Sequence, residues 1–212
     1  MFIISLLCLI LLSLKSNFEL NLVMLSIENS NLSVDDIYFF LENPHAVKLN
    51  SLLRKKIILS YERAQKIVKN TKPVYGINTG FGPLCTKRIT SKETKSLQRN
   101  LLLSHSVGVG DPINPELARI MLLCKIKSLS MGFSGVSIDL IERLIYFFQN
   151  NLTPHVPEKG SVGASGDLAP LAHLFLPVIG EGFFWDGEEK VESKKILKKH
   201  KLKPLDLNAK EG

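Results

Sequence analysis

The chain has 212 residues, 45% of them hydrophobic and 22% charged, with a formal net charge of +7. This length allows one sizeable core or two small ones, and the composition is that of an ordinary globular protein. The densest run of lysines, from Lys194 to Lys203, recurs at helical spacing without aromatic residues. A solvated helix face is therefore expected there, with a polyanion site as the lesser alternative, and nucleic acid is not expected as a partner.

The three cysteines are far apart and show neither metal nor disulfide spacing, so free thiols in a reducing, cytoplasmic compartment are expected. Residues 1–14 are apolar and uncharged, but fall short of the roughly 20 residues that a membrane-spanning helix needs. No Lys or Arg precedes them, and no small-x-small cleavage site clearly follows. We interpret residues 1–23 as an upstream extension ahead of a start at Met24, in preference to a signal or anchor, and expect no membrane partner.

The remainder, residues 24–212, is predicted to form one mainly helical domain with few strands. Ser33 and Thr90 each begin a capping box that marks the start of a helix. A loop with three glycines and a proline, residues 74–83, separates the second helix from the third. Hydrophobic periodicity and the positions of Pro and Gly predict six helices, at about residues 34–43, 47–70, 91–107, 115–132, 137–150 and 168–180.

The helix at 115–132 is apolar nearly all round, so we expect it to be buried among other helices. Asp167 is placed to cap the helix that follows it, after a loop rich in Pro and Gly. Residues 183–191 can form a short hairpin around Asp186-Gly187. Four histidines show no ligand spacing and are predicted to be structural or exposed, with the third of them in the core: His45, His155, His173 and His200.

A run of small residues, Gly-Ser-Val-Gly-Ala-Ser-Gly-Asp at 160–167, precedes the predicted start of the last helix. It is not a hydrolase elbow, since the glycine required at the fifth position of that motif is absent. Without large side chains in the way, the amide nitrogen of Gly166 can reach the carbonyl carbon of Ala164. Closing that ring and removing the hydroxyl of Ser165 as water would leave a methylidene carbon, which is an electrophile. A plain turn is the alternative for this tripeptide by itself.

Residues 160–173, which read Gly-Ser-Val-Gly-Ala-Ser-Gly-Asp-Leu-Ala-Pro-Leu-Ala-His, resemble the signature of the aromatic amino acid lyases in their histidine-specific form. Two more segments agree, the one from Tyr75 to Gly82 and the one from Gln98 to Gly108. The resemblance is colinear from about residue 31 to residue 212. It implies a mainly α chain, the N-terminal part of that family's helical fold, with little strand and ending before the central helical bundle.

The resemblance implies a particular cofactor and reaction. In the family, the tripeptide that matches Ala164, Ser165 and Gly166 cyclises to 4-methylidene-imidazol-5-one, with no metal and no pyridoxal phosphate. Such an electrophile is needed because the β-hydrogen of an amino acid is barely acidic and ammonium is a poor leaving group. The implied activity is elimination of ammonia from L-histidine to give trans-urocanate, the first step of histidine degradation, by a cytoplasmic homotetramer.

Three further residues receive roles from the resemblance. Tyr75, otherwise a packing tyrosine, matches the proposed base for the β-proton, and its ordinary pKa of about 10 must then be lowered. His105, otherwise a core or capping histidine, matches the position that faces the substrate side chain, and its pairing with Ser104 resembles histidine-specific members. Asp167 can cap its helix, assist ring formation, or do both. Asn78 and Thr79 can fix their loop or contact a ligand.

The chain departs from the family in its length. The active-site asparagine, the arginine for the substrate carboxylate and the long helices of the tetramer all follow the position that matches Gly212. These residues alone are therefore expected to lack a complete site and to be inactive. We expect them to belong to a longer enzyme, with a genuine truncation as the alternative. Two other functions stay open: a tyrosine or phenylalanine ammonia-lyase or aminomutase, and an inactive remnant.

Overall fold

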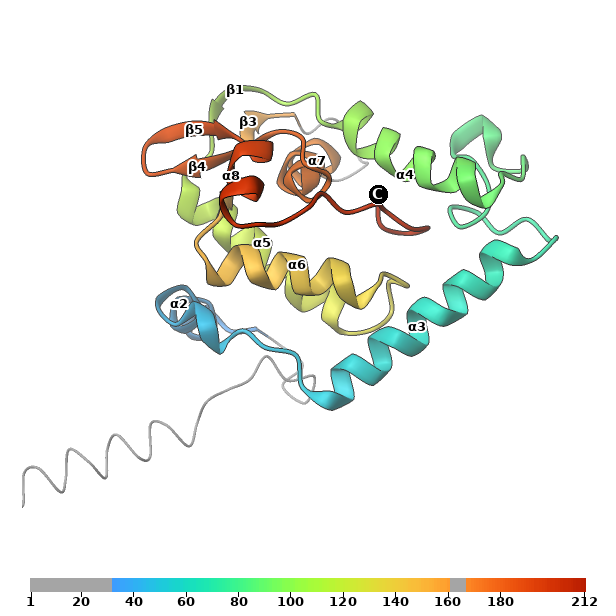
Figure 1. Ribbon diagram of the computed structural model, residues 1–212, viewed down its shortest axis with the longest axis horizontal. Helices are drawn as coiled ribbons and strands as arrows, with labels where there is room; N and C mark the ends of the chain where they lie inside the picture. The colour runs from blue at the N-terminus through green and yellow to red at the C-terminus, as the bar shows by residue number, and fades with distance from the viewer. Residues whose placement is uncertain (1–31, 161–166) are drawn as a thin grey trace, which may run out of the picture.

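The computed structural model describes residues 32–160 and 167–212, so residues 1–23 and the tripeptide Ala164-Ser165-Gly166 lie outside the described residues. Helices dominate the described part and the strands are short, which confirms the mainly α prediction (Figure 1). The α-helices are α2 (Val34–Glu42), α3 (Ser51–Lys69), α4 (Ser91–His105), α5 (Pro115–Ser130), α6 (Ile138–Gln149), α7 (Leu168–Phe175) and α8 (Ser193–Lys199). Three 3-10 turns accompany them: η1 (Pro44–Ala46), η2 (Gly82–Leu84) and η4 (Leu176–Ile179).

Side-chain caps set the helix starts. The two predicted capping boxes are present, at Ser33 for α2 and at Thr90 for α4. Helix α3 begins four residues later than predicted, because the side chain of Asn50 accepts a hydrogen bond of 2.8 Å from the Leu53 amide. The residues before it are held elsewhere, since the carbonyl of Val47 accepts a hydrogen bond from Gln149 on α6.

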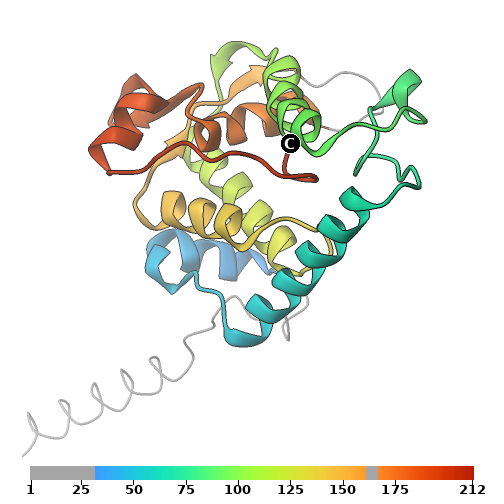
Figure 2. The same ribbon diagram turned by 45° about the vertical axis from the view of Figure 1, so that its right-hand side comes forward.

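The core lies where α5 and α6 pack together, with α2 and α3 against α5, while α7 packs on α4 (Figure 2). Helix α6 buries Phe147 and Phe148, and Phe147 meets Phe184 edge to face with 5.0 Å between ring centroids. The prediction that α5 is buried all round is wrong in part. Leu117 on its outer face is 51% exposed, because the neighbouring helices cover only the opposite side.

In the described part of the chain, short strands form two small antiparallel sheets. Strand β1 (Val109–Pro112) pairs with β3 (Pro157–Lys159), and β4 (Phe183–Asp186) lies between β2 (Thr153–Pro154) and β5 (Glu189–Glu192). The hairpin of β4 and β5 confirms the prediction, with Gly187 in its turn at φ 66°. Strand β1 was not predicted, because two glycines and a proline within five residues are typical of a loop. The strand forms by pairing with β3, which is distant in the sequence.

The α7 region ends differently from the prediction. The helix gives way at Leu176 to the 3-10 turn η4, since Pro177 has no N–H to continue the α-helical pattern, and Gly180 ends the turn at φ 76°. At the other end, Asp167 occupies the N-cap position, but its side chain makes no capping hydrogen bond. The predicted N-cap position of Asp167 is therefore confirmed, whereas the expected side-chain capping bond is not formed, and its role in ring formation stays a prediction.

The lysine-rich run confirms the expected solvated face. Its side chains on α8 are mostly exposed, and three of them pair with acidic neighbours: Lys194 with Glu181, Lys195 with Glu192 and Lys199 with Asp186. The lysine side chains in these pairs remain exposed to solvent. Across residues 32–160 and 167–212, none of the helices combines the length and the apolar character that crossing a membrane requires.

Candidate active site

The site begins at the two described residues that flank segment 161–166. Gly160 follows β3, and a Cβ added to it would lie 2.9 Å from the Cβ of Ala169 and 3.2 Å from the Cα of Gly108. Ala169 is the second residue of α7, and Asp167 directly precedes that helix. Both flanks of the segment thus meet at the first turn of α7, where helical N–H groups lack intrahelical partners and the helix dipole favours negative charge.

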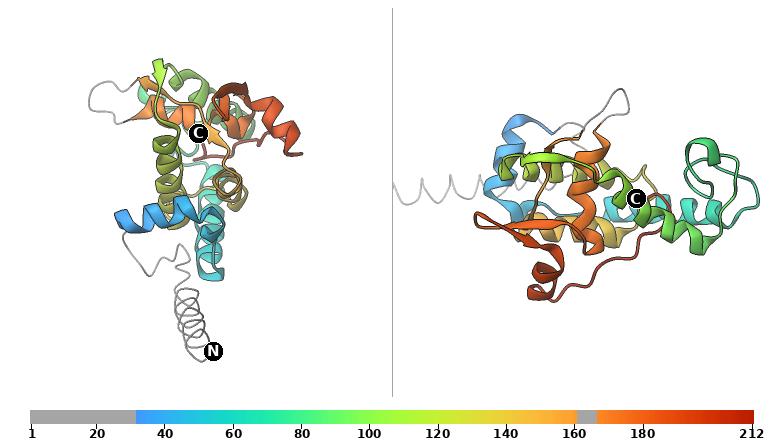
Figure 3. Two further views of the ribbon diagram at one scale, coloured as in Figure 1. Left: turned by 90° about the vertical axis from the view of Figure 1, so that its left-hand side faces the viewer. Right: turned by 90° about the horizontal axis from the view of Figure 1, so that it is seen from above.

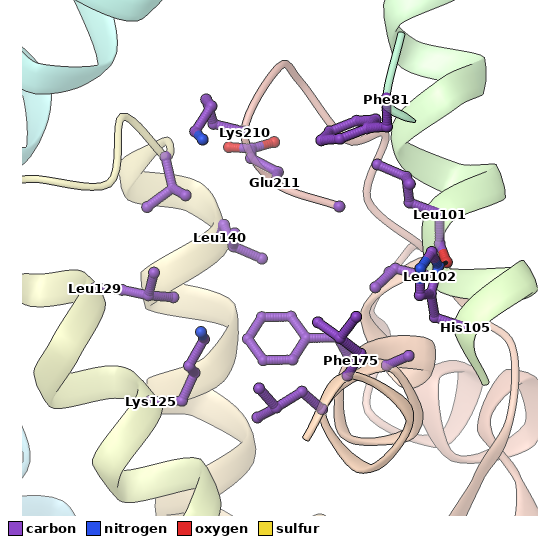
Figure 4. A pocket seen from close by; sticks show the side chains of 15 residues that line it. Phe81, Leu101, Leu102, His105, Lys125, Leu129, Leu140, Phe175, Lys210 and Glu211 are labelled. Atoms are coloured by element: carbon purple, nitrogen blue, oxygen red, sulfur yellow. Dashed lines mark hydrogen bonds between the residues drawn. The ribbon is translucent and has the colours of Figure 1, made fainter. Parts of the chain in front are cut away.

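A cavity of about 400 Å³ opens between this turn and α4. Figure 4 shows Phe81, Leu101 and His105 on one side, with Leu129 and Leu140 facing them from α5 and α6. Its walls are mostly apolar, and its charged lining residues are Lys125, Lys210 and Glu211. A mostly apolar lining with a few polar groups is typical of a site for a small ligand. The lining residues are Phe81, Leu101, Leu102, His105, Lys125, Leu129, Val136, Leu140, Leu168, Leu171, Ala172, Phe175, Lys210, Glu211 and Gly212.

His105 is the imidazole of this cavity. It is the last residue of α4, and its Nδ1 lies 2.8 Å from the carbonyl oxygen of Leu101. That carbonyl can only accept, so the geometry favours a proton on Nδ1 and leaves Nε2 as the acceptor of the ring. The helix therefore fixes the orientation of His105 and presents a defined imidazole at the cavity wall.

Tyr75 lies apart from His105. Its side chain is 61% exposed, and it does not line the cavity. Its ring instead contacts Phe81 edge to face, with 5.6 Å between centroids, and Phe81 does line the cavity. The loop that carries both rings projects at one end of the molecule (Figure 3). The structure therefore places His105 on the cavity wall and Tyr75 outside the cavity, against the lining residue Phe81.

Asn78 fixes this loop to the end of α3. It is fully buried, and its Nδ2 lies 3.1, 3.3 and 3.1 Å from the carbonyl oxygens of Ile67, Asn70 and Lys72. Its Oδ1 accepts the N–H of Val74 at 2.7 Å. The amide oxygen and nitrogen are both engaged by the backbone of the loop and of the end of α3, so of the two roles considered for Asn78 the structure supports loop fixing.

Thr79 has the same structural role. Its Oγ1 accepts the N–H of Gly76 at 3.2 Å and donates to the carbonyl of Gly80 at 2.9 Å, and the side chain is buried. The hydroxyl is therefore engaged on both sides by the backbone of its own loop. Together with Asn78, it holds the stretch between Tyr75 and Phe81 in a fixed path.

Two contacts of the site region were not predicted from the sequence, one made by Glu211 and one by His173. Glu211 is buried, and its carboxylate accepts the N–H of Ser137 at 2.7 Å and that of Asn208 at 2.6 Å. His173, expected in the core, is half-buried, and its Nε2 accepts the N–H of Gly108 at 3.0 Å. The Gly108–His173 and Ser137–Glu211 bonds each join positions more than 60 residues apart, so neither has a local sequence signal.

The described residues hold no group of three His, Cys, Asp or Glu side chains arranged to bind a metal ion. The cavity lining contains one histidine, His105 on α4, and one acidic residue, Glu211 near the C-terminal end of the chain.

Comparison with known proteins identifies the family. The chain matches the model of the aromatic amino acid lyases over residues 32–212. It is 39% identical over 186 residues to a histidine ammonia-lyase of Caldanaerobacter subterraneus subsp. tengcongensis, covering 88% of this chain and 37% of that protein. A crystal structure of histidine ammonia-lyase from Trypanosoma cruzi matches with a TM-score of 0.70 and 33% identity, covering 78% of this chain and 32% of that one.

A tyrosine aminomutase from Streptomyces globisporus is also similar in structure, with a TM-score of 0.77 and 32% identity over 85% of this chain and 34% of that one. The chain thus spans about a third of the length of these relatives. The family match includes every described residue of the cavity and of the turn at α7. The chain therefore belongs to the aromatic amino acid lyase family.

Proposed function

We propose that the natural protein eliminates ammonia from L-histidine to give trans-urocanate, as the first step of histidine degradation. The observation that carries the proposal is the 39% identity to a named histidine ammonia-lyase across 88% of this chain. The site agrees with it, because an oriented imidazole, His105, lines an apolar cavity beside the first turn of α7. A cytoplasmic homotetramer, in which residues 24–212 form the cofactor-bearing part of the lyase domain, belongs to the same proposal.

Ala164, Ser165 and Gly166 are proposed to form 4-methylidene-imidazol-5-one. The surroundings fit, since Gly160 packs on Ala169 so closely that no side chain has room, and both flanks of the segment meet at the N-terminal turn of α7. When formed, this ring supplies an electrophile that draws electrons from the substrate. The N–H groups of the turn and the helix dipole stabilise the negative charge that develops there.

The other chemical roles are proposed for Tyr75 and His105. His105 holds the substrate side chain through its Nε2, since Nδ1 is engaged by Leu101. Tyr75 takes the β-proton at its Oη, which requires the phenolate to be stabilised relative to the free side chain. For this step the Tyr75 ring must turn from its exposed position on Phe81 toward the cavity that Phe81 lines. Asp167 is proposed to assist ring formation from beside Gly166.

The second candidate is a lyase or aminomutase for tyrosine or phenylalanine. The specific observation in its favour is the TM-score of 0.77 to tyrosine aminomutase, which exceeds the value of 0.70 for the histidine ammonia-lyase structure. Both proteins share the fold, so substrate choice depends on the cavity wall rather than on the scaffold. The Ser104-His105 pair favours histidine.

The substrate is tested with the natural protein by following ultraviolet absorbance with histidine, tyrosine and phenylalanine in turn. We expect urocanate to form from histidine, with the other two amino acids giving little or no product. Mass spectrometry of each mixture separates elimination, which releases ammonia, from isomerisation, which leaves the mass unchanged. Product from tyrosine and none from histidine would replace the leading proposal with the second one.

Replacing Tyr75 by phenylalanine tests the proposed base. The variant keeps the ring that contacts Phe81 but lacks the hydroxyl, so we expect turnover to fall by roughly 10²–10⁴-fold, the usual contribution of a positioned base. Ring formation and folding should be unchanged. Tyr38→Phe is the matched control, because Tyr38 is similarly exposed, at 58%, but lies on α2. Equal turnover in the wild-type and Tyr75→Phe proteins would remove Tyr75 from the mechanism.

A further inference from the structure

His173 joins two segments of the site region. It lies on α7, and its Nε2 accepts the N–H of Gly108, which is three residues beyond the end of α4. A Cβ added to Gly108 would lie 3.1 Å from the His173 ring and 3.2 Å from the Cβ of Pro157 on β3. The contact is therefore both a hydrogen bond and a close approach that leaves little room for a side chain at position 108.

This contact connects the two parts of the proposed active site. His105 is held at the end of α4, and Gly108 continues that end of the chain into β1. Helix α7 carries His173 in its second turn and begins directly after the ring-forming tripeptide. The Gly108–His173 bond is a side-chain link that spans 65 residues between these two segments. It constrains the separation of His105 from the N-terminal turn of α7.

We propose that His173 is a positioning residue, which sets the distance between the substrate-binding His105 at the end of α4 and the first turn of α7. This inference rests on the proposed function. It assigns His173 no contact with substrate and no part in ring closure. Loss of the His173 contact should weaken substrate binding and turnover, because a shift of a binding group by about 1 Å can reduce the rate by roughly 10²-fold.

The bond requires a neutral imidazole with its proton on Nδ1, since a protonated ring would present a second N–H to the N–H of Gly108. Burial lowers the pKa of His173 below its usual value, and two nearby groups lower it further: His155, which precedes β3, and Lys190 on β5. The folded protein thus keeps the accepting form over the range above this lowered pKa. As pH falls through the lowered pKa, His173 gains a proton and the bond is lost.

Two variants separate hydrogen bonding from packing. His173→Gln keeps an acceptor, its side-chain oxygen, at nearly the same reach, whereas His173→Leu keeps bulk but has no acceptor. In the natural protein we expect kcat/KM for histidine to fall roughly 10–10²-fold in His173→Leu, and by less than about 3-fold in His173→Gln. The Gln variant should also retain a larger fraction of its activity at acid pH than the wild type.

Intact mass and ring nitrogen NMR complete the experiment. The mass deficit of two waters that reports ring formation should be equal in all three proteins, and its loss only in His173→Leu would overturn the positioning role. Equal losses of kcat/KM in the Gln and Leu variants would overturn it too. If His173→Leu does not fold, the ¹⁵N spectrum of the wild type tests the proposal. A proton on Nε2 of His173 would contradict the hydrogen bond from Gly108 and overturn the positioning role. A wild type without mass deficit refutes the proposed function instead.

Discussion

Replacing Ser165 by alanine is expected to abolish ammonia release from histidine. The hydroxyl of Ser165 is the group whose loss creates the proposed methylidene carbon, so alanine leaves no electrophile. We expect turnover to fall by more than about 10³-fold, since removing a single transition-state hydrogen-bond donor already costs roughly 10²–10³-fold. The measurement is urocanate absorbance, with intact mass taken on the same samples.

The mass of Ser165→Ala should return most or all of the two waters missing from the wild type. Ser128→Ala is the control, since Ser128 is exposed on α5 and outside the cavity. It should retain both the mass deficit and the activity. Full activity in Ser165→Ala would show that the reaction does not use the proposed electrophile, whatever the substrate.

Replacing Asn78 by alanine is expected to give the largest loss of stability. The change removes the donor to the carbonyls of Ile67, Asn70 and Lys72 and the acceptor for the Val74 N–H, all in a buried position. Each buried group left without a partner costs about 1–3 kcal/mol, so we expect a loss of about 3 kcal/mol or more. For a chain of this size that corresponds to a midpoint lower by roughly 6–12 °C.

Asn70→Ala is the matched control for that experiment. Asn70 is also an asparagine at the end of α3, but it is exposed, and its side chain makes only a long bond of 3.4 Å to the amide of Lys72. Its midpoint should stay within a degree or two of the wild type. Thermal unfolding followed by circular dichroism checks both variants. Equal midpoints for Asn78→Ala and the wild type would contradict the loop-fixing role.

The local features of the fold were predictable because their causes lie within a few residues. The caps at Ser33 and Thr90 satisfy backbone groups three residues away, and the hairpin turn at Gly187 needs only its own left-handed φ. Strand β1 failed to show in the sequence because its partner, β3, lies more than 40 residues later. The hydrogen bonds to β3 stabilise β1, whose own residues do not favour a strand.

The candidate site also contains residues that were predicted from the sequence and contacts that were not. His105 was predicted as a site residue from the resemblance of its segment to the family, and the structure puts it on the wall of an apolar cavity. The buried contacts of Glu211 and the Gly108–His173 bond could not be predicted, since single charged or imidazole residues carry no periodic signal. Tyr75 shows the opposite case: its motif is specific, but the structure places its ring outside the cavity.

The central claim is that the protein builds an electrophile from its own backbone at the first turn of α7. The most direct test is the intact mass of the natural protein, followed by the mass of the peptide that contains residues 160–173. The account predicts that this peptide weighs two waters less than its encoded sequence, one lost in ring closure and one from Ser165. A peptide with the full encoded mass would contradict the account.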